Sequence, residues 1–195
     1  MKMERYNGYS PAPVSTKPDC LPAGAYEAII KGARVEQTQW GGQRLILALD
    51  VTEGEHKGHY QKLFDYDSAN GNFTPKWKGT IRLNVPSGDG SEKDSWTKKL
   101  FEGAIYAIEQ SNPGYVFDFD DATLKGKAVG INVRNKEWEY NDMTGWTTEI
   151  GRLEVLDDVK AGKVKPMKDR PLQNKPQTAD EAAGFTAVET DNLPF

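Results

Sequence analysis

The sequence of 195 residues contains a single cysteine, Cys20, so the chain cannot form an internal disulfide. It also lacks long apolar runs, and no stretch approaches the ~18 residues that a membrane-spanning helix needs. The first residues lead into polar, proline-containing sequence without the apolar segment of a signal peptide. These absences predict a protein of a reducing cytoplasm.

Signatures of catalysis are missing as well. The sequence has no nucleophile elbow, no phosphate-binding loop and no dinucleotide-binding fingerprint. A turn over residues 53–59 holds two glutamates and two histidines, but their spacing matches no standard zinc pattern. The aspartates of residues 118–121 alternate with phenylalanines, which is typical of a half-buried strand end or loop. We therefore expect no enzyme activity, no metal and no cofactor.

The net charge of −4 argues against a uniformly basic nucleic-acid binder. Its distribution is uneven, however, because residues 171–195 carry four acids and one base, whereas residues 160–170 carry five bases and one acid. Residues 1–170 together carry 24 bases and 25 acids and are close to neutral, so any surface that binds anions must be local. This asymmetry is compatible with a nucleic-acid-binding body and a separate protein-binding tail.

Most of the chain between residues 24 and 159 reads as strands separated by glycine-containing turns. Leu45, Leu47, Leu49 and Val51 occupy every second position, which places them on one face of a strand, and Arg44, Ile46, Ala48 and Asp50 lie on the other face. The pattern predicts five principal strands, at residues 25–35, 44–51, 80–85, 125–140 and 146–156, and an extra strand at residues 60–64.

One helix is predicted over residues 95–111. Its apolar residues fall at helical spacing and form one stripe, composed of Trp96, Leu100, Phe101, Ala104, Ile105 and Ile108. Asp94 is the expected N-cap, and Asn112-Pro113-Gly114 ends the helix.

Five strands with a helix between the third and the fourth are the order of an OB-fold, a partly open Greek-key barrel. The fold class is therefore mainly β, although other small α+β folds share this order. We divide the chain into an extended N-terminal arm at residues 1–23, an OB-fold domain at residues 24–159 and a flexible tail at residues 160–195. The tail is rich in Pro, Gln, Ala and Asp and is expected to be disordered.

Aromatic and basic residues occur together in the loops and on the outer strand positions. Single-stranded nucleic acid is held by this mixture, because bases stack on aromatic rings while cations contact phosphates. Core packing and base stacking both remain open for Tyr60, Phe64 and Trp138, whereas the glycine-flanked loops around Trp40 and Trp77 favour binding. The candidate DNA-binding residues are Trp40, Arg44, Tyr60, Lys62, Phe64, Phe73, Lys76, Trp77, Lys78, Arg82 and Trp138.

The chain ends with Asp191-Asn192-Leu193-Pro194-Phe195. An aromatic residue that bears the terminal carboxylate and follows proline and acids suits capture in a basic-rimmed pocket of another protein. Asp191, Leu193, Pro194 and Phe195 are the candidate partner-binding residues, with an arbitrary tail end as the alternative.

This tip resembles that of bacterial single-stranded-DNA-binding proteins, which ends Asp-Asp-Asp-Ile-Pro-Phe, although it has fewer acids and Leu193 in place of Ile. The body, over roughly residues 20–160, resembles the single-stranded-DNA-binding proteins of temperate phages and integrative elements of Gram-positive bacteria. The stretches that carry this resemblance are residues 46–54, 76–79, 101–115 and 124–127. The resemblance implies an OB-fold, single-stranded DNA as ligand, a bacterial host cytoplasm, and a phage single-strand annealing recombinase or host replication and repair proteins as partners.

The sequence therefore predicts a non-catalytic protein that binds and protects single-stranded DNA and recruits partners through its C-terminal tip. Two alternatives stay open. One is a carbohydrate-binding β-domain, whose exposed tryptophans would stack on sugar rings, and the other is an adaptor that binds only proteins.

Overall fold

The structure is a computed structural model that describes residue 7 and residues 18–39, 41–71, 74–141 and 143–172. Its described elements follow one another as β1 (Gly24–Gln37), β2 (Gln43–Val51), α1 (His59–Ala69), β3 (Thr80–Asn84), α2 (Glu92–Ser111), the 3₁₀ turn η1 (Asp121–Leu124), β4 (Ala128–Tyr140), β5 (Met143–Glu154) and α3 (Leu156–Lys160).

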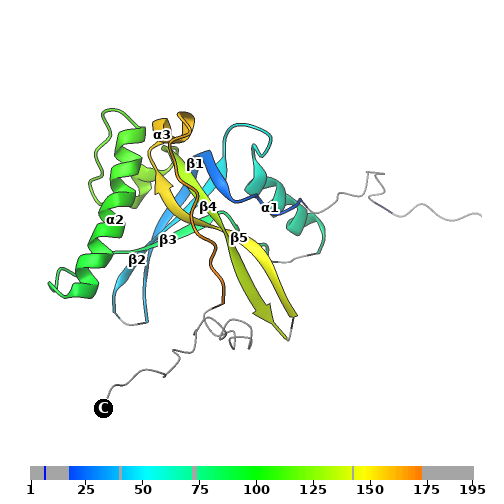
Figure 1. The fold of residues 1–195 in the computed structure, drawn as a ribbon, viewed down its shortest axis with the longest axis horizontal. Coiled ribbons are helices and arrows are strands. Elements are labelled where there is room, and N and C mark those ends of the chain that lie inside the picture. Colours follow the sequence, from blue (N-terminus) through cyan, green and yellow to red (C-terminus); the bar gives the residue numbers. More distant parts are fainter. Residues whose placement is uncertain (1–6, 8–17, 40, 72–73, 142, 173–195) are drawn as a thin grey trace, which may run out of the picture.

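The described strands form one antiparallel sheet of order β3-β2-β1-β4-β5 (Figure 1). β1 lies at the centre and pairs with β2 through residues 28–37 and with β4 through residues 24–29. A register shift between Ile30 and Gly32 bends this long strand, as bulges do. The sheet curls into an open barrel, and α2 lies between β3 and β4 in the sequence. The five-stranded, mainly β OB-fold architecture predicted from the sequence is therefore confirmed.

The barrel interior is built from the alternation seen in the sequence. Leu45, Leu47, Leu49 and Val51 of β2 are all buried, as predicted. They pack with inward residues of β1, β4 and α2 in one hydrophobic core. The opposite face of β2 is therefore turned outward, and its cross-strand neighbours form the surface considered below.

Helix α2 begins three residues before the predicted start. Ser91, and not Asp94, is its N-cap, because the Ser91 hydroxyl accepts a hydrogen bond from the Asp94 amide. Asp94 is instead buried and accepts hydrogen bonds from the amides of Ser87 and Gly88. Phe101, Ala104 and Ile108 of the predicted stripe are buried, so the helix closes the barrel with this face.

Two members of the predicted stripe lie elsewhere on α2. Trp96 and Leu100 are 61% and 51% exposed. The predicted apolar stripe is therefore buried from Phe101 onward, whereas its first two members lie on the surface.

The extra strand predicted at residues 60–64 is also wrong, because these residues lie in helix α1. The helix begins after Gly58, whose left-handed backbone (φ 67°) turns the chain away from β2. The Asp50 carboxylate accepts a hydrogen bond from the Tyr60 amide at 3.0 Å and fixes this first turn. Tyr60 and Leu63 are buried on one side. In a segment this short, the apolar spacing fits both a strand and a helix.

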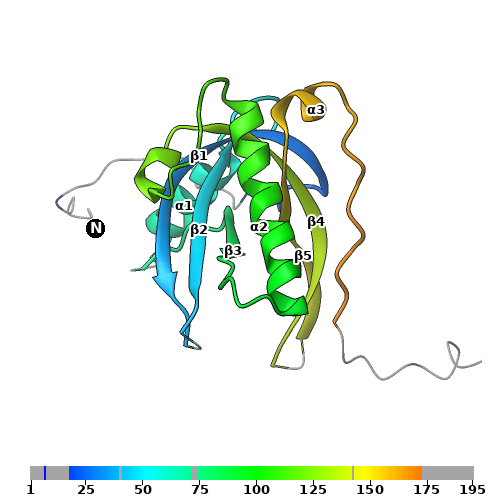
Figure 2. The ribbon, with the colours of Figure 1, turned by 90° about the vertical axis from the view of Figure 1, so that its left-hand side faces the viewer.

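The chain beyond α3 stays on the barrel. Residues 163–172, called the strap below, run along β4 (Figure 2). The Asn135 carbonyl accepts from the Arg170 amide at 2.8 Å, and the Arg170 carbonyl accepts from the Glu137 amide at 2.9 Å. The strap thereby covers an edge of β4 that β1 leaves unpaired.

The packed unit is consequently larger than residues 24–159. The described chain reaches Leu172 on one side, and Leu21 is 1% exposed in the core on the other. The remaining residues of the expected arm and tail lie outside the described part. Among the described residues, no helix is long and apolar enough to cross a membrane.

Candidate nucleic-acid interface

The outward face of β1, β2 and β3 carries cross-strand rows of side chains. Arg34 pairs with Ile46, and Ile46 pairs with Arg82, so two arginines flank one isoleucine in a row across three strands. Ile46 is only 3% exposed although it points outward. The arginine stems are the cross-strand neighbours that can cover it while their charged ends stay in solvent.

This face is hollowed into a groove of about 480 Å³, called the front groove below. It is lined by residues of β1, β2, β3 and the loop before β3, namely Gly32, Ala33, Arg34, Ile46, Ala48, Pro75, Lys76, Trp77, Thr80 and Arg82. Three of these residues are cations and none is an acid. Among the described residues, Arg34, Lys76 and Arg82 make no ion pair and no side-chain hydrogen bond. The front groove is therefore a local positive surface on a protein of net negative charge.

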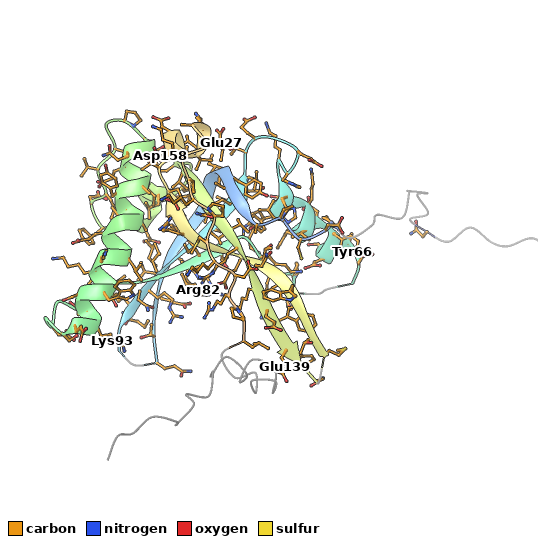
Figure 3. All side chains as sticks on the ribbon, in the orientation of Figure 1. Glu27, Tyr66, Arg82, Lys93, Glu139 and Asp158 are labelled. Carbon is orange, nitrogen blue, oxygen red and sulfur yellow. The ribbon has the colours of Figure 1, made fainter. Side chains whose placement is uncertain are left out.

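Arg82 is an exposed residue of β3, an edge strand of the sheet, and is labelled near the centre of the view in Figure 3. It lines the front groove and also a second groove on the other side of β3.

Trp77 lines the front groove, and contacts with β2 and α1 fix its ring. Its indole Nε1–H donates to the Leu49 carbonyl at 3.0 Å, and its ring lies 5.8 Å from that of Phe64. The loop can approach β2 this closely because residue 79 is glycine. A Cβ there would come within 2.4 Å of the Tyr60 ring and 2.5 Å of the Leu49 carbonyl oxygen. Trp77 is thus both a half-buried packing residue and part of the groove.

The second groove has a volume of about 850 Å³ and is called the side groove below. Its walls are β3, α2 and β5, with residues of β4 and the strap at one end. Seven of its lining residues are cations and three are carboxylates. Lys78 is one of the cations, and its ammonium lies 2.9 Å from the Asp67 carboxylate of α1.

Glu149 gathers the cations at the strap end of the side groove. Its carboxylate accepts from Arg134 at 2.8 Å and from Arg170 at 3.1 Å, and it lies 3.3 Å from the Lys136 ammonium. Burial raises the pKa of Glu149, but hydrogen bonds from these three residues outweigh it and hold the pKa below its ordinary value. The single negative charge of Glu149 is therefore shared by three cations, so this end of the side groove carries a net positive charge.

The remaining candidates from the sequence lie outside the front groove. Tyr60 is 6% exposed and belongs to the core. Burial first, and the neighbouring Asp50 second, raise the pKa of its phenol above the usual range. Phe64 supports Trp77, and Lys62 is exposed on α1. A buried ring such as Tyr60 offers no face on which a base could stack.

Arg44 and Trp138 occupy other parts of the sheet. Arg44 lies one row beyond the groove, where its side chain donates to Asn84 at 3.1 Å and lies 3.7 Å from Glu36. Trp138 is 37% exposed on the β4–β5 hairpin, and its ring packs on Gly145. Trp40 and Phe73, like the tip residues Asp191, Leu193, Pro194 and Phe195, fall outside the described residues.

Comparison with known proteins found a match to a family model and a weak match to a solved structure. Residues 10–74, a third of the chain, match a family described as "Protein of unknown function (DUF669)". No curated protein matches the chain. Among solved structures, a chain described as "Yeast RPA bound to ssDNA" matches with a TM-score of 0.27 and 11% identity, over 79% of this chain and 89% of that chain. The fold assignment rests on the strand order and not on this likeness.

Sequence reasoning missed Arg34 and the side groove. Arg34 lies directly opposite Ile46 in the β1–β2 pairing, so a known register would have placed it on the same face as Ile46. That register depends on the bulge between Ile30 and Gly32, which leaves no clear pattern in the sequence. Arg134 and Arg170 come together only through the strap, and no periodicity marks that segment.

The turn with two histidines is structural in this chain. His59 is 6% exposed and packs edge-to-face on Tyr60, with ring centroids 5.1 Å apart. Burial and, after it, the nearby His56 lower the pKa of His59. Among the described residues, no group of three or more His, Cys, Asp or Glu side chains is arranged to hold a metal ion.

Proposed function

We propose that this protein binds single-stranded DNA without catalysis, and that the front groove is the primary binding surface. The observation that carries this proposal is the composition of the groove, where three unpaired cations and a fixed tryptophan line one concavity without a carboxylate. Cations contact phosphates and aromatic rings accept stacked bases, so these side chains match a single strand.

The same surface favours a single strand over a duplex. A ring such as Trp77 stacks on a base only when the base is not already stacked in a helix. Duplex readout uses a helix or ribbon that enters the major groove, whereas the cations here lie on the floor and walls of a concavity. Because stacking and phosphate contacts are sequence-tolerant, we expect little base preference.

The cellular role we propose is protection of single-stranded DNA during replication or recombination of a phage or mobile element in a bacterial host. Its support is the resemblance of residues 46–54, 76–79, 101–115 and 124–127 to the proteins of those elements. We further propose that the tip, Asp191 to Phe195, recruits a recombinase or a host replication protein. The tip has the same charge sign as DNA, so it is suited to a basic pocket on a protein.

The experiment is a fluorescence anisotropy titration of labelled oligo-dT of about 15 nucleotides, compared with a duplex of the same length. We expect tighter binding of the single strand. Arg34→Ala should weaken that binding, whereas Arg44→Ala, which removes the same charge from the same face outside the groove, should change it less. Equal affinity for duplex and single strand, or no binding of either, would contradict the proposal and leave the carbohydrate-binding and protein-adaptor alternatives.

The role of the tip is tested separately. A protein that lacks Asp191 to Phe195 should bind oligo-dT as well as the full chain does, and should lose capture of a purified partner recombinase or replication protein. Loss of DNA binding on truncation, or capture that survives it, would show that the tip does not serve as a docking peptide.

A further inference from the structure

The side groove has no role in the binding surface described so far, yet it is larger than the front groove and adjoins it. Thr80 and Arg82 of β3 line both. A strand that leaves the front groove across β3 would therefore enter the side groove without crossing an intervening surface. We propose that the side groove holds a second segment of the same single strand, along α2, an inference that rests on the proposed function.

The charges of the side groove fit a polyanion. Its lining has seven cations against three carboxylates. Two of these carboxylates are already bound to cations, because Glu149 is held by three of them and Glu154 accepts from Arg152 at 2.7 Å. Lys99 of α2 makes no ion pair among the described residues and lies 5.6 Å from the centre of the Trp96 ring. An excess of positive charge therefore faces the groove.

One wall of the groove is an exposed face of α2, a helix that lies in front of β3 and β5 in Figure 2. Tyr106 is 58% exposed on this face and offers a ring on which a base can stack. Gly103 lies in the middle of the helix, where glycine is unfavourable, and a Cβ at this position would meet nothing within 4 Å. The missing side chain leaves the helix backbone open to close approach by a ligand.

These features distinguish DNA from a protein as the occupant. A protein interface is usually depleted of charge at its centre, whereas cations from β3, α2, β5 and the strap surround this groove. The proposal predicts a longer site than the front groove alone provides. The first segment should be filled by an oligonucleotide of about 5 nucleotides and both segments by one of about 15, within the range known for OB-folds.

The test compares the affinities of oligo-dT of these two lengths in the full-length protein. Lys99→Ala should weaken binding of the long oligonucleotide about fivefold at ~0.1 M salt and reduce its salt slope by about 0.7, because one phosphate contact is lost. Its affinity for the short oligonucleotide should not change. Lys98→Ala is the matched control, since Lys98 is the neighbouring lysine, pairs with Glu102 and does not line the groove.

Gly103→Gln provides a second variant whose folding can be checked independently. A better helix former at an open helical position should raise the Tm by about 2–4 °C. The added side chain should nevertheless obstruct the groove and weaken binding of the long oligonucleotide only.

The outcomes separate this inference from the proposed function. If Lys99→Ala and Gly103→Gln leave the affinity for the long oligonucleotide unchanged, the side groove does not hold DNA, although the front groove still can. That result would leave the exposed face of α2 as a protein-docking surface. Equal weakening for both lengths would also overturn the inference, because the variants would then act on the front groove. If the unaltered protein binds neither length, the proposed function itself fails.

Discussion

Replacement of Arg82 by alanine should weaken the binding of single-stranded DNA in a salt-dependent way. Arg82 lines both grooves, is exposed, and makes no ion pair or side-chain hydrogen bond among the described residues, so its removal should leave the fold intact. If its guanidinium neutralises one phosphate, the slope of log K against log salt should become shallower by about 0.7.

The magnitude follows from that slope. When the salt concentration falls from 1 M to ~0.1 M, one phosphate contact raises log K of DNA binding by about 0.7. This is a factor of about five in affinity, or about 1 kcal/mol of binding free energy. The affinities of Arg82→Ala and the unaltered protein should therefore differ about fivefold near 0.1 M salt and converge towards 1 M. Replacement of Arg34, Lys76 and Arg82 together should flatten the slope by about 2 and reduce the affinity by about a hundredfold at the lower salt concentration.

Anisotropy titrations of oligo-dT at four or five salt concentrations measure both quantities. Arg44→Ala is the control, because it removes one charge from the same face while its partners Glu36 and Asn84 lie outside the groove. Parallel slopes for Arg82→Ala and the unaltered protein would refute the reasoning. An equal loss for Arg44→Ala would also refute it, since net charge and not the groove would then govern binding.

Three further predictions concern the scaffold. Trp77→Ala should lower the free energy of unfolding by about 2–3 kcal/mol in chemical denaturation, because it removes half-buried packing and the hydrogen bond to Leu49; an unchanged midpoint would mean that the ring is not packed. The lowered pKa of His59 means that the unfolded chain binds more protons than the folded one, so the stability present above pH ~6.5 should decline as the pH falls below it. His59→Gln should flatten that decline in Tm between about pH 7.5 and 5.5, and a profile identical to that of the unaltered protein would assign the effect to other groups. A chain that ends at Leu172 should keep the Tm of the full protein, whereas one that ends at Lys160 should lose several degrees with the strap hydrogen bonds; equal Tm values would show that the strap adds no stability.

The part of the fold that was predictable is the part governed by local periodicity. Leu45, Leu47, Leu49 and Val51 recur at every second position of β2, so the face that the strand turns to the core follows directly from the sequence. The end of α2 was equally clear, because Asn112 precedes Pro113, and proline disfavours helix in the residue before it. In both places one local signal determines the structure.

The predictions failed where a tertiary contact decides the local structure. Residues 60–64 are helical because Asp50 of β2 fixes the first turn, a contact that no local pattern reveals. The strap has no apolar periodicity, and it is held by backbone hydrogen bonds to β4 that any sequence without proline at those positions could make.

In the candidate site too, residues marked by a local sequence signal were predicted, whereas residues placed by tertiary contacts were not. Lys76 and Trp77 were named from their residue types and loop position, and Arg82 from its residue type on a predicted strand; the structure brings all three into one groove. Tyr60 was named from an assumed strand, and it lies in the core because that segment is a helix. Arg34 required the register across a bulge, which only the paired backbone supplies.

The most direct test of the central claim is to map where a single strand touches the protein. Oligo-dT of about 15 nucleotides that carries a photoreactive thymine analogue can be cross-linked to the full-length protein, and the modified peptides can be identified by mass spectrometry. The account predicts cross-links within residues 74–84 and around Arg34, the segments that form the front groove. Cross-links confined to residues that line neither groove, such as the exposed loop at residues 116–120, would contradict it.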